Sequence, residues 1–222
     1  MRMRRKKHLA ERVEKVSDIL TVSDSDVLNC VIAERDKKYF DYKSLFGNAN
    51  PVEMEIGCGK GGFIVKKAAN NPGVNYLAVE LLQNIIVTAA ERAKAENIVN
   101  VRFFNCGADY LGRYIPPQSL NAVYLNFSPP YPGKRYINRR LTKDALVKAY
   151  KMYLKSGAAV YLKTDDKDFF DFSAVVFKDN GFSVLDYRAG CEGDEETEYE
   201  RKFNAMGLPI YAFKAVKPIE NS

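Results

Sequence analysis

Apolar residues along the chain form short runs typical of buried strands, and longer segments with helical spacing lie between these runs. The runs predict strands at 52–56, 76–79, 101–104, 122–127, 158–163, 182–187 and 210–215. The helical spacing predicts helices at 62–69, 81–95, 142–154, with Thr142 as its N-cap, and 169–178, which Asn180-Gly181 closes. This alternation predicts an α/β fold with a mostly parallel sheet of seven strands. The last two strands lack a full crossover helix between them, so we expect one antiparallel edge strand.

The 222 residues suffice for one domain with a full hydrophobic core. The turn cluster Gly47-Asn48-Ala49-Asn50-Pro51 precedes the first predicted strand and separates two segments of different character. We therefore expect a basic N-terminal arm and a leading helical or irregular segment over 1–47, followed by the main domain over 48–218.

The net charge of +6 is concentrated in a few places. Residues 1–12 hold six cationic side chains against the single acid Glu11, and the stretch 134–140 holds Lys134, Arg135, Arg139 and Arg140 without an acid. The stretch 192–200 holds six acids and reads as an acidic loop. Clustered cations suit phosphate contacts, which gain affinity from released counterions. Charge alone is equally compatible with a solvated arm and a solvated loop.

Composition and cysteine spacing exclude several classes of protein. A hydrophobic fraction of 46% and a charged fraction of 28% are ordinary for a globular chain and argue against disorder. No apolar run approaches the roughly 20 residues that cross a bilayer, and no apolar signal region follows the charged residues 1–7. Cys30, Cys58, Cys106 and Cys191 form no CxxC pair, which argues against a metal site or a disulfide framework. We expect a cytoplasmic protein.

A glycine-rich turn stands where the first predicted strand passes into a helix. Gly57 and Gly59 allow a tight turn and close approach of a ligand to the backbone, as in dinucleotide-binding proteins. Glu55, two residues before the first glycine, suits a ligand with a free ammonium group, such as the methionine end of S-adenosylmethionine. Lys60 would instead suit a pyrophosphate, so the turn alone leaves a nicotinamide cofactor possible. Glu80 follows the second strand, where a carboxylate holds ribose hydroxyls or stabilises a helix N-terminus.

Two further segments bear on the chemistry of the site. The stretch 105–109 follows the third strand and is placed to line an adenine ring through the backbone at Gly107, although Asp109 equally suits a helix cap. The turn Ser128-Pro129-Pro130-Tyr131 is typical of methyltransferases that modify an amino group of a base. In those enzymes the polar first residue and a backbone carbonyl accept hydrogen bonds from the amine, and the aromatic ring stacks on the base.

The whole chain resembles the bacterial tRNA (guanine-N7)-methyltransferase family. The motifs that carry the resemblance are Met1-Arg2-Met3-Arg4, the Glu55–Gly61 turn, Val79-Glu80-Leu81, Val123 to Ser128, Lys134-Arg135, Arg139-Arg140-Leu141-Thr142, Lys163-Thr164-Asp165, Thr197-Glu198-Tyr199-Glu200-x-Lys202-Phe203 and Gly207-x-Pro209-Ile210-Tyr211. The resemblance implies a Rossmann-like class I fold that uses S-adenosylmethionine. It also implies that N7 of guanine 46 in the tRNA variable loop receives the methyl group, with the enzyme acting as a monomer or a homodimer.

The resemblance assigns a role to individual residues. Those expected at the cofactor are Glu55, Gly57, Gly59, Glu80, Gly107 and Asn126. Those expected at the substrate base are Tyr131, Asp165, Thr197, Tyr199 and Glu200. Those expected to contact RNA are Arg135, Tyr136, Asn138, Arg139 and Arg140. No metal ligand is implied.

The chain departs from the family pattern near the reacting groups. Pro129 replaces an acid, Gly133 a lysine and Gly107 an adenine-binding acid, so no catalytic residue is assigned. One lost charged hydrogen bond typically costs about 1.5 to 3 kcal/mol. Guanine N7, however, carries a lone pair and no proton, so its methylation needs alignment and no general base. Two alternatives stay open: an amino-group methyltransferase that uses the Ser-Pro-Pro-Tyr turn, and a tRNA-binding protein with reduced activity.

Overall fold

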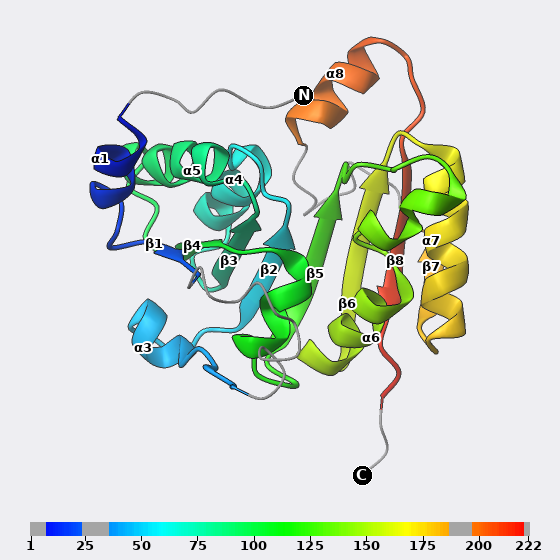
Figure 1. The fold of residues 1–222 in the computed structure, drawn as a ribbon, viewed down its shortest axis with the longest axis horizontal. Coiled ribbons are helices and arrows are strands. Elements are labelled where there is room, and N and C mark those ends of the chain that lie inside the picture. The colour runs from blue at the N-terminus through cyan, green and yellow to red at the C-terminus, as the bar shows by residue number, and fades with distance from the viewer. Residues whose placement is uncertain (1–7, 24–35, 187–196, 220–222) are drawn as a thin grey trace.

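The computed structural model describes residues 8–23, 36–186 and 197–219 as one mostly parallel sheet flanked by helices (Figure 1). Within these residues the sheet has eight strands in the order β1-β4-β3-β2-β5-β6-β8-β7. The strands are β1 Leu20–Val22, β2 Val52–Ile56, β3 Asn75–Glu80, β4 Val101–Asn105, β5 Leu120–Asn126, β6 Leu154–Thr164, β7 Ser183–Asp186 and β8 Tyr211–Val216. The strand order reverses between β2 and β5, where the crevice beyond the carboxyl ends of the strands takes a ligand in this class of fold.

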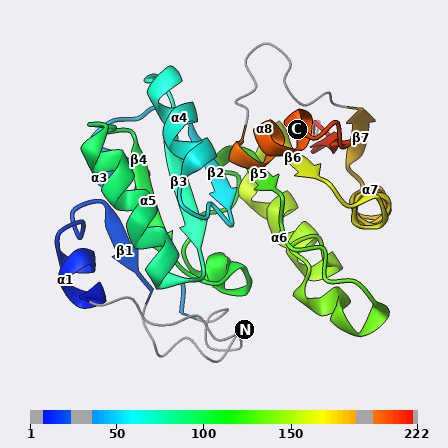
Figure 2. The same cartoon turned by 90° about the horizontal axis from the view of Figure 1, so that it is seen from above.

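Helices cover both faces of the sheet (Figure 2). They are α1 Leu9–Glu14, α3 Tyr42–Phe46, α4 Gly62–Asn70, α5 Gln83–Ala95, α6 Asp144–Tyr153, α7 Lys167–Asp179 and α8 Glu198–Ala205, with short 3₁₀ helices η1 Ala108–Arg113 and η2 Lys134–Arg139. Side chains of β3 alternate between the faces: Leu77 and Val79 join the core under α6 and α7, while Tyr76 and Ala78 join the core under α4 and α5. Because both faces are buried, these strands read as continuous apolar runs.

The predicted fold class is confirmed, and the sheet differs from the expectation at its two edges. The additional strand β1 comes from the leading segment and pairs in parallel with β4, with Leu20 opposite Phe103. This strand has three residues, of which only Leu20 is buried. It is therefore too short to show an alternation of buried and exposed positions in the sequence. At the other edge, β8 runs antiparallel between β6 and β7, so the antiparallel strand is one position inside the edge.

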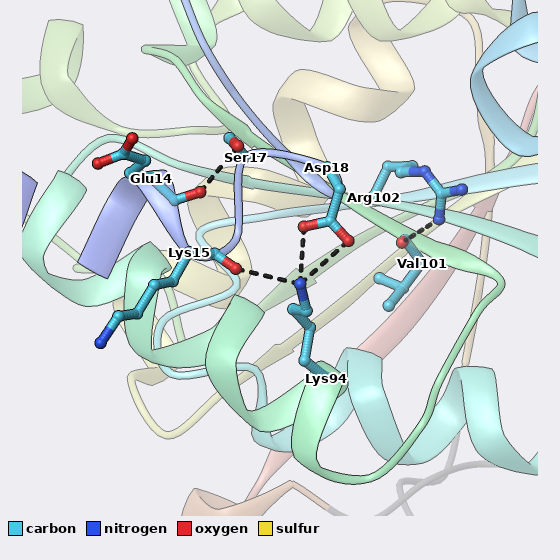
Figure 3. A network of polar contacts seen from close by, with 7 residues as sticks. All are labelled: Glu14, Lys15, Ser17, Asp18, Lys94, Val101 and Arg102. Carbon is cyan, nitrogen blue, oxygen red and sulfur yellow. Dashed lines mark hydrogen bonds and ion pairs between the residues drawn. The ribbon is translucent and has the colours of Figure 1, made fainter. Parts of the chain in front are cut away.

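The leading segment packs against α5 through polar contacts. Arg12 donates hydrogen bonds to both carboxylate oxygens of Glu91, at 2.7 and 2.5 Å. Figure 3 shows Lys94 donating to the carboxylate of Asp18 at 2.9 Å and to the carbonyl of Lys15 at 3.0 Å. The hydrogen bond from Lys94 lowers the pKa of Asp18. The division at residue 47 stays a prediction. Within residues 8–23, β1 joins the sheet of the main domain and α1 precedes it.

Two further expectations change locally. The helix predicted to begin at Thr142 begins at Asp144, and the buried Thr142 hydroxyl lies 2.8 Å from that of Ser173 on α7. Asp109 forms an ion pair with Lys143 at 2.5 Å and makes no helix cap. In the part of the chain that the structure describes, every helix is too short or too polar to traverse a bilayer.

Candidate cofactor and substrate site

The glycine turn after β2 is fixed against β3. The backbone N–H groups of Gly57 and Cys58 both donate to the carbonyl of Val79, at 2.8 and 3.0 Å. Gly57 has φ +83°, a conformation that residues with a Cβ rarely adopt. At Gly61 an added Cβ would lie 2.9 Å from the Cβ of Ala89, so glycine also allows α4 to approach α5. At Gly59 no atom of the described residues, its chain neighbours aside, lies within 4 Å of such a position, which leaves space for a ligand against the backbone.

Glu55 lies beneath this turn as a buried carboxylate with one unused oxygen. Its side chain is 2% exposed, and its Oε1 accepts a hydrogen bond from Asn126 Nδ2 at 2.9 Å. Glu55 Oε2 and Asn126 Oδ1 are buried without a hydrogen-bond partner among the described residues. Burial raises the pKa of Glu55 to about 8, with a smaller contribution from Glu80. A buried carboxylate of this kind is stabilised by a cationic ligand group, and the ammonium of S-adenosylmethionine fits that requirement.

Glu80 connects the glycine turn to the start of α5. Its Oε1 accepts from the N–H of Leu82 at 2.9 Å and its Oε2 from the N–H of Gly59 at 3.3 Å. The expected helix-terminus role is therefore present. Each carboxylate oxygen has a further lone pair, so the same side chain retains acceptors for a ribose hydroxyl.

A cavity of about 380 Å³ joins the glycine turn to the end of β5 and the start of α8. Its lining residues are Glu55, Gly57, Gly59, Lys60, Gly62, Phe63, Ile85, Asn126, Phe127, Thr197 and Tyr199. The size is typical of cofactor pockets. Four of the residues expected at the cofactor and two expected at the substrate thus share one cavity. Gly107 lies outside this lining, beside Leu81 and Tyr110, and its adenine contact stays a prediction.

Helix α8 lies beyond the carboxyl ends of β5 and β6 (Figures 1 and 2) and is fixed by Glu200. Thr197 and Glu200 form a reciprocal capping box, in which each side chain accepts the other's backbone N–H, at 2.9 and 2.7 Å. Glu200 is 1% exposed, and its second oxygen accepts from Lys163 Nζ at 2.9 Å. The expectation of an acidic loop over 192–200 is therefore wrong for 197–200, and 192–196 lie outside the described residues. The signature Thr-x-x-Glu would have predicted this helix start.

Two aromatic rings form the outer wall of the cavity. Tyr199 is 59% exposed and stacks on Phe127, with ring centroids 5.5 Å apart and planes at 19°. Phe127 follows the last residue of β5 in a left-handed conformation, φ +48°. The position of Phe127 in the cavity wall was not predicted, because in the sequence Phe127 is one more apolar residue of a predicted strand. An exposed stacked ring is the type of surface on which an unstacked base is held.

The residues expected to contact RNA divide into two groups. Arg135 and Arg139 are exposed and flank the ring of Tyr136, with guanidinium carbons 4.5 and 5.3 Å from its centroid, and Asn138 is also exposed. Arg140 is instead buried, 8% exposed, and donates to backbone carbonyls of the Ser-Pro-Pro-Tyr turn. Its expected RNA contact stays a prediction, and its Nε and Nη2 already donate inside the protein.

The remaining predicted substrate residues lie at the same end of the sheet. Asp165 is exposed directly after β6, and Tyr131 is half-buried in the turn after β5. The hydroxyl of Ser128, at the start of that turn, is buried without a partner among the described residues. Their contacts with a base stay predictions.

The fold, the glycine turn and the buried Glu55 define a class I S-adenosylmethionine-dependent methyltransferase. The fold is shared with a 16S rRNA methyltransferase, KamB, at a TM-score of 0.62 and 14% identity over 82% of this chain and 95% of that one. It is also shared with a precorrin-6y C5,15-methyltransferase from Geobacter metallireducens, at a TM-score of 0.55 and 15% identity over 89% and 94% of the two chains. At these identities the likeness concerns the fold.

Sequence comparison identifies the family. A family model described as putative methyltransferase matches residues 49–213. A tRNA (guanine-N(7)-)-methyltransferase of Bacillus licheniformis is 40% identical over 83% of this chain and 89% of its own length. The Bacillus subtilis protein of the same name is 41% identical over 77% and 84% of the two chains. The chain belongs to the tRNA (guanine-N(7)-)-methyltransferase family.

Proposed function

We propose that this protein transfers the methyl group of S-adenosylmethionine to N7 of guanine 46 in the variable loop of tRNA, in the cytoplasm. The observation that carries the proposal is the joining, in one cavity, of the buried Glu55 carboxylate and the exposed Tyr199 ring, in a chain of this family. Bound S-adenosylmethionine supplies an electrophilic methyl group on a sulfonium centre. The residues around the cavity supply binding and alignment.

One side of the cavity binds the cofactor and the other side binds the substrate base. Glu55 holds the cofactor ammonium through its unpaired Oε2, and Glu80 accepts from a ribose hydroxyl. The Tyr199 and Phe127 rings hold the splayed guanine by stacking. Because guanine N7 already has a free lone pair, the absence of an acid at Pro129 removes no required proton acceptor. Holding the two reactants in line supplies several kcal/mol of the barrier reduction.

The proposal is tested by the product. The protein is incubated with labelled S-adenosylmethionine and unmodified tRNA, and the labelled nucleoside is identified. We expect 7-methylguanosine, and we expect none from a tRNA transcript with adenosine at position 46. Methylated adenosine from unmodified tRNA would favour the amino-group alternative, and binding without turnover would favour the inactive binder.

Cofactor affinity should depend on pH through Glu55. Its pKa of about 8 means that the free protein holds this carboxyl protonated at pH 6, whereas ammonium binding requires the ionised form. Affinity should therefore rise by about 10-fold or more between pH 6 and 8, with release of a proton on binding. Above pH 8 it should fall again, because a free α-amino group loses its proton near about 8. Calorimetry in two buffers of different ionisation enthalpy measures both effects. Equal affinity at pH 6 and 8 would contradict this assignment.

The exposed cations of η2 should bind the phosphates of tRNA. Replacement of Arg135 or Arg139 by alanine should reduce the slope of log affinity against log salt concentration by about 0.7 to 0.9 for each phosphate that the variant no longer neutralises. Lys155, exposed at the opposite end of β6, is the matched control and should leave the slope unchanged. Filter binding of tRNA between 50 and 200 mM salt measures the slope, and equal slopes in all variants would exclude these phosphate contacts.

A further inference from the structure

The turn between β5 and η2 has few backbone donors of its own. Pro129, Pro130 and Pro132 have no N–H group, so none of the three can donate a backbone hydrogen bond. Tyr131, between them, has φ +44°, which is an unfavourable conformation for a bulky residue. The preceding residues Asn126 and Phe127 line the cofactor cavity. An unusual backbone conformation therefore lies beside the site, and donors from outside the turn can stabilise it.

Arg140 provides these donors. Its Nε donates to the carbonyl of Pro130 at 2.8 Å and its Nη2 to the carbonyl of Tyr131 at 3.3 Å. The guanidinium carbon lies 4.3 Å from the ring centroid of Phe172 and 5.7 Å from that of Phe169, both on α7. A charged donor of this kind forms stronger hydrogen bonds than a neutral one. The planar guanidinium can also stack on a ring while it donates, which an ammonium group cannot do in the same geometry.

We propose that Arg140 is a positioning residue for the substrate base, which it orients by holding the Pro130 and Tyr131 carbonyls and hence the Tyr131 ring. The inference rests on the proposed function and deepens it. Arg140 acts through the turn and does not touch phosphate, in contrast to the exposed Arg139 beside it. The pair of adjacent arginines therefore offers a matched comparison between positioning and RNA binding.

Activity distinguishes the two roles. Arg140→Met should lower kcat for tRNA methylation by about 10- to 100-fold, because small misplacement of a reactant has effects of that size. The Arg140→Met variant should bind S-adenosylmethionine as tightly as the wild type. The slope of its log tRNA affinity against log salt concentration should also equal that of the wild type. Arg139→Met should instead reduce the slope of log tRNA affinity against log salt concentration and the tRNA affinity itself. Arg140→Lys should stay impaired, since lysine retains the charge but cannot form the same paired, stacked contact.

A spectroscopic readout makes the test independent of turnover. The chain contains no tryptophan, so Tyr131→Trp places a single tryptophan in the turn, and its fluorescence can be excited apart from that of the tyrosines. In this background Arg140→Met should increase acrylamide quenching by about two-fold or more, whereas Arg139→Met should leave it unchanged. The positioning role is overturned if Arg140→Met keeps the wild-type kcat, if Arg140→Met and Arg139→Met give the same quenching, or if Arg140→Lys restores full activity. If instead the wild type makes no 7-methylguanosine, the proposed function fails while the quenching comparison still reports on Arg140.

Discussion

Replacement of Lys163 by methionine should lower the free energy of unfolding by about 3 to 5 kcal/mol, because it leaves the buried Glu200 carboxylate without its charged partner. Lys163 and Glu200 are 2% and 1% exposed, and their charged atoms lie 2.9 Å apart. Neither side chain can turn to water to recover the missing interaction. Urea denaturation followed by circular dichroism measures the change.

The double variant Lys163→Met with Glu200→Gln is the control for this pair. Glutamine retains an oxygen for the N–H of Thr197, so the start of α8 keeps its cap while the unpaired charge is removed. We expect the double variant to recover most of the stability, since replacing both members of a buried pair is often close to neutral. Breaking the surface pair Lys167 and Asp171 in the same way should have a much smaller effect on stability, because solvent screens the exposed charges. If Lys163→Met lowered the free energy of unfolding by less than about 1 kcal/mol, the result would contradict the assigned role of the buried pair.

Replacement of Glu55 by glutamine should weaken S-adenosylmethionine binding by about 10- to 150-fold, equivalent to the about 1.5 to 3 kcal/mol of a charged hydrogen bond. The amide keeps the shape of the side chain and can still accept from Asn126, but it has no charge for the ammonium group. The rise in affinity between pH 6 and 8 should disappear in this variant, because the titrating group is gone. Calorimetric titration with the cofactor measures both effects.

Glu53→Gln is the matched control for Glu55. Glu53 lies two residues earlier on the same strand, and its carboxylate accepts from the Tyr124 hydroxyl at 2.8 Å, away from the cavity lining. The Glu53→Gln variant should bind S-adenosylmethionine with wild-type affinity, and this affinity should depend on pH as in the wild type. Equal decreases in both variants would indicate a general effect on β2 and would remove the assignment of Glu55 to the cofactor.

The core strands and helices were predictable because their signals are local. The strands that became β2 to β6 are apolar runs between turn residues, and burial on both faces makes such runs continuous. The three-residue β1 was not predictable, since a strand this short has no period to detect and forms through pairing with the distant β4. The insertion of β8 between β6 and β7 likewise depends on pairing partners and not on either strand alone.

For the site, the sequence determined which chemistry is present. Glycines at 57 and 59 and a carboxylate at Glu55 predicted an ammonium-bearing cofactor at one strand end, and the structure places all three in one cavity. The motif residues of the family also followed from sequence, because they lie in short contiguous segments.

Only the tertiary structure decided which of these residues are exposed and which are buried in contacts with other side chains or backbone groups. Within one cationic run, Arg139 is exposed and Arg140 is buried against a proline-rich turn, and within one short motif Tyr199 is exposed while Glu200 pairs with Lys163. Arg139 and Arg140 carry the same charge and adjoin in the sequence, but burial and partners are set by segments elsewhere in the chain. The physical reason is that a buried charged group must be paired or hydrogen-bonded, and its partner is chosen by the packing of the whole fold.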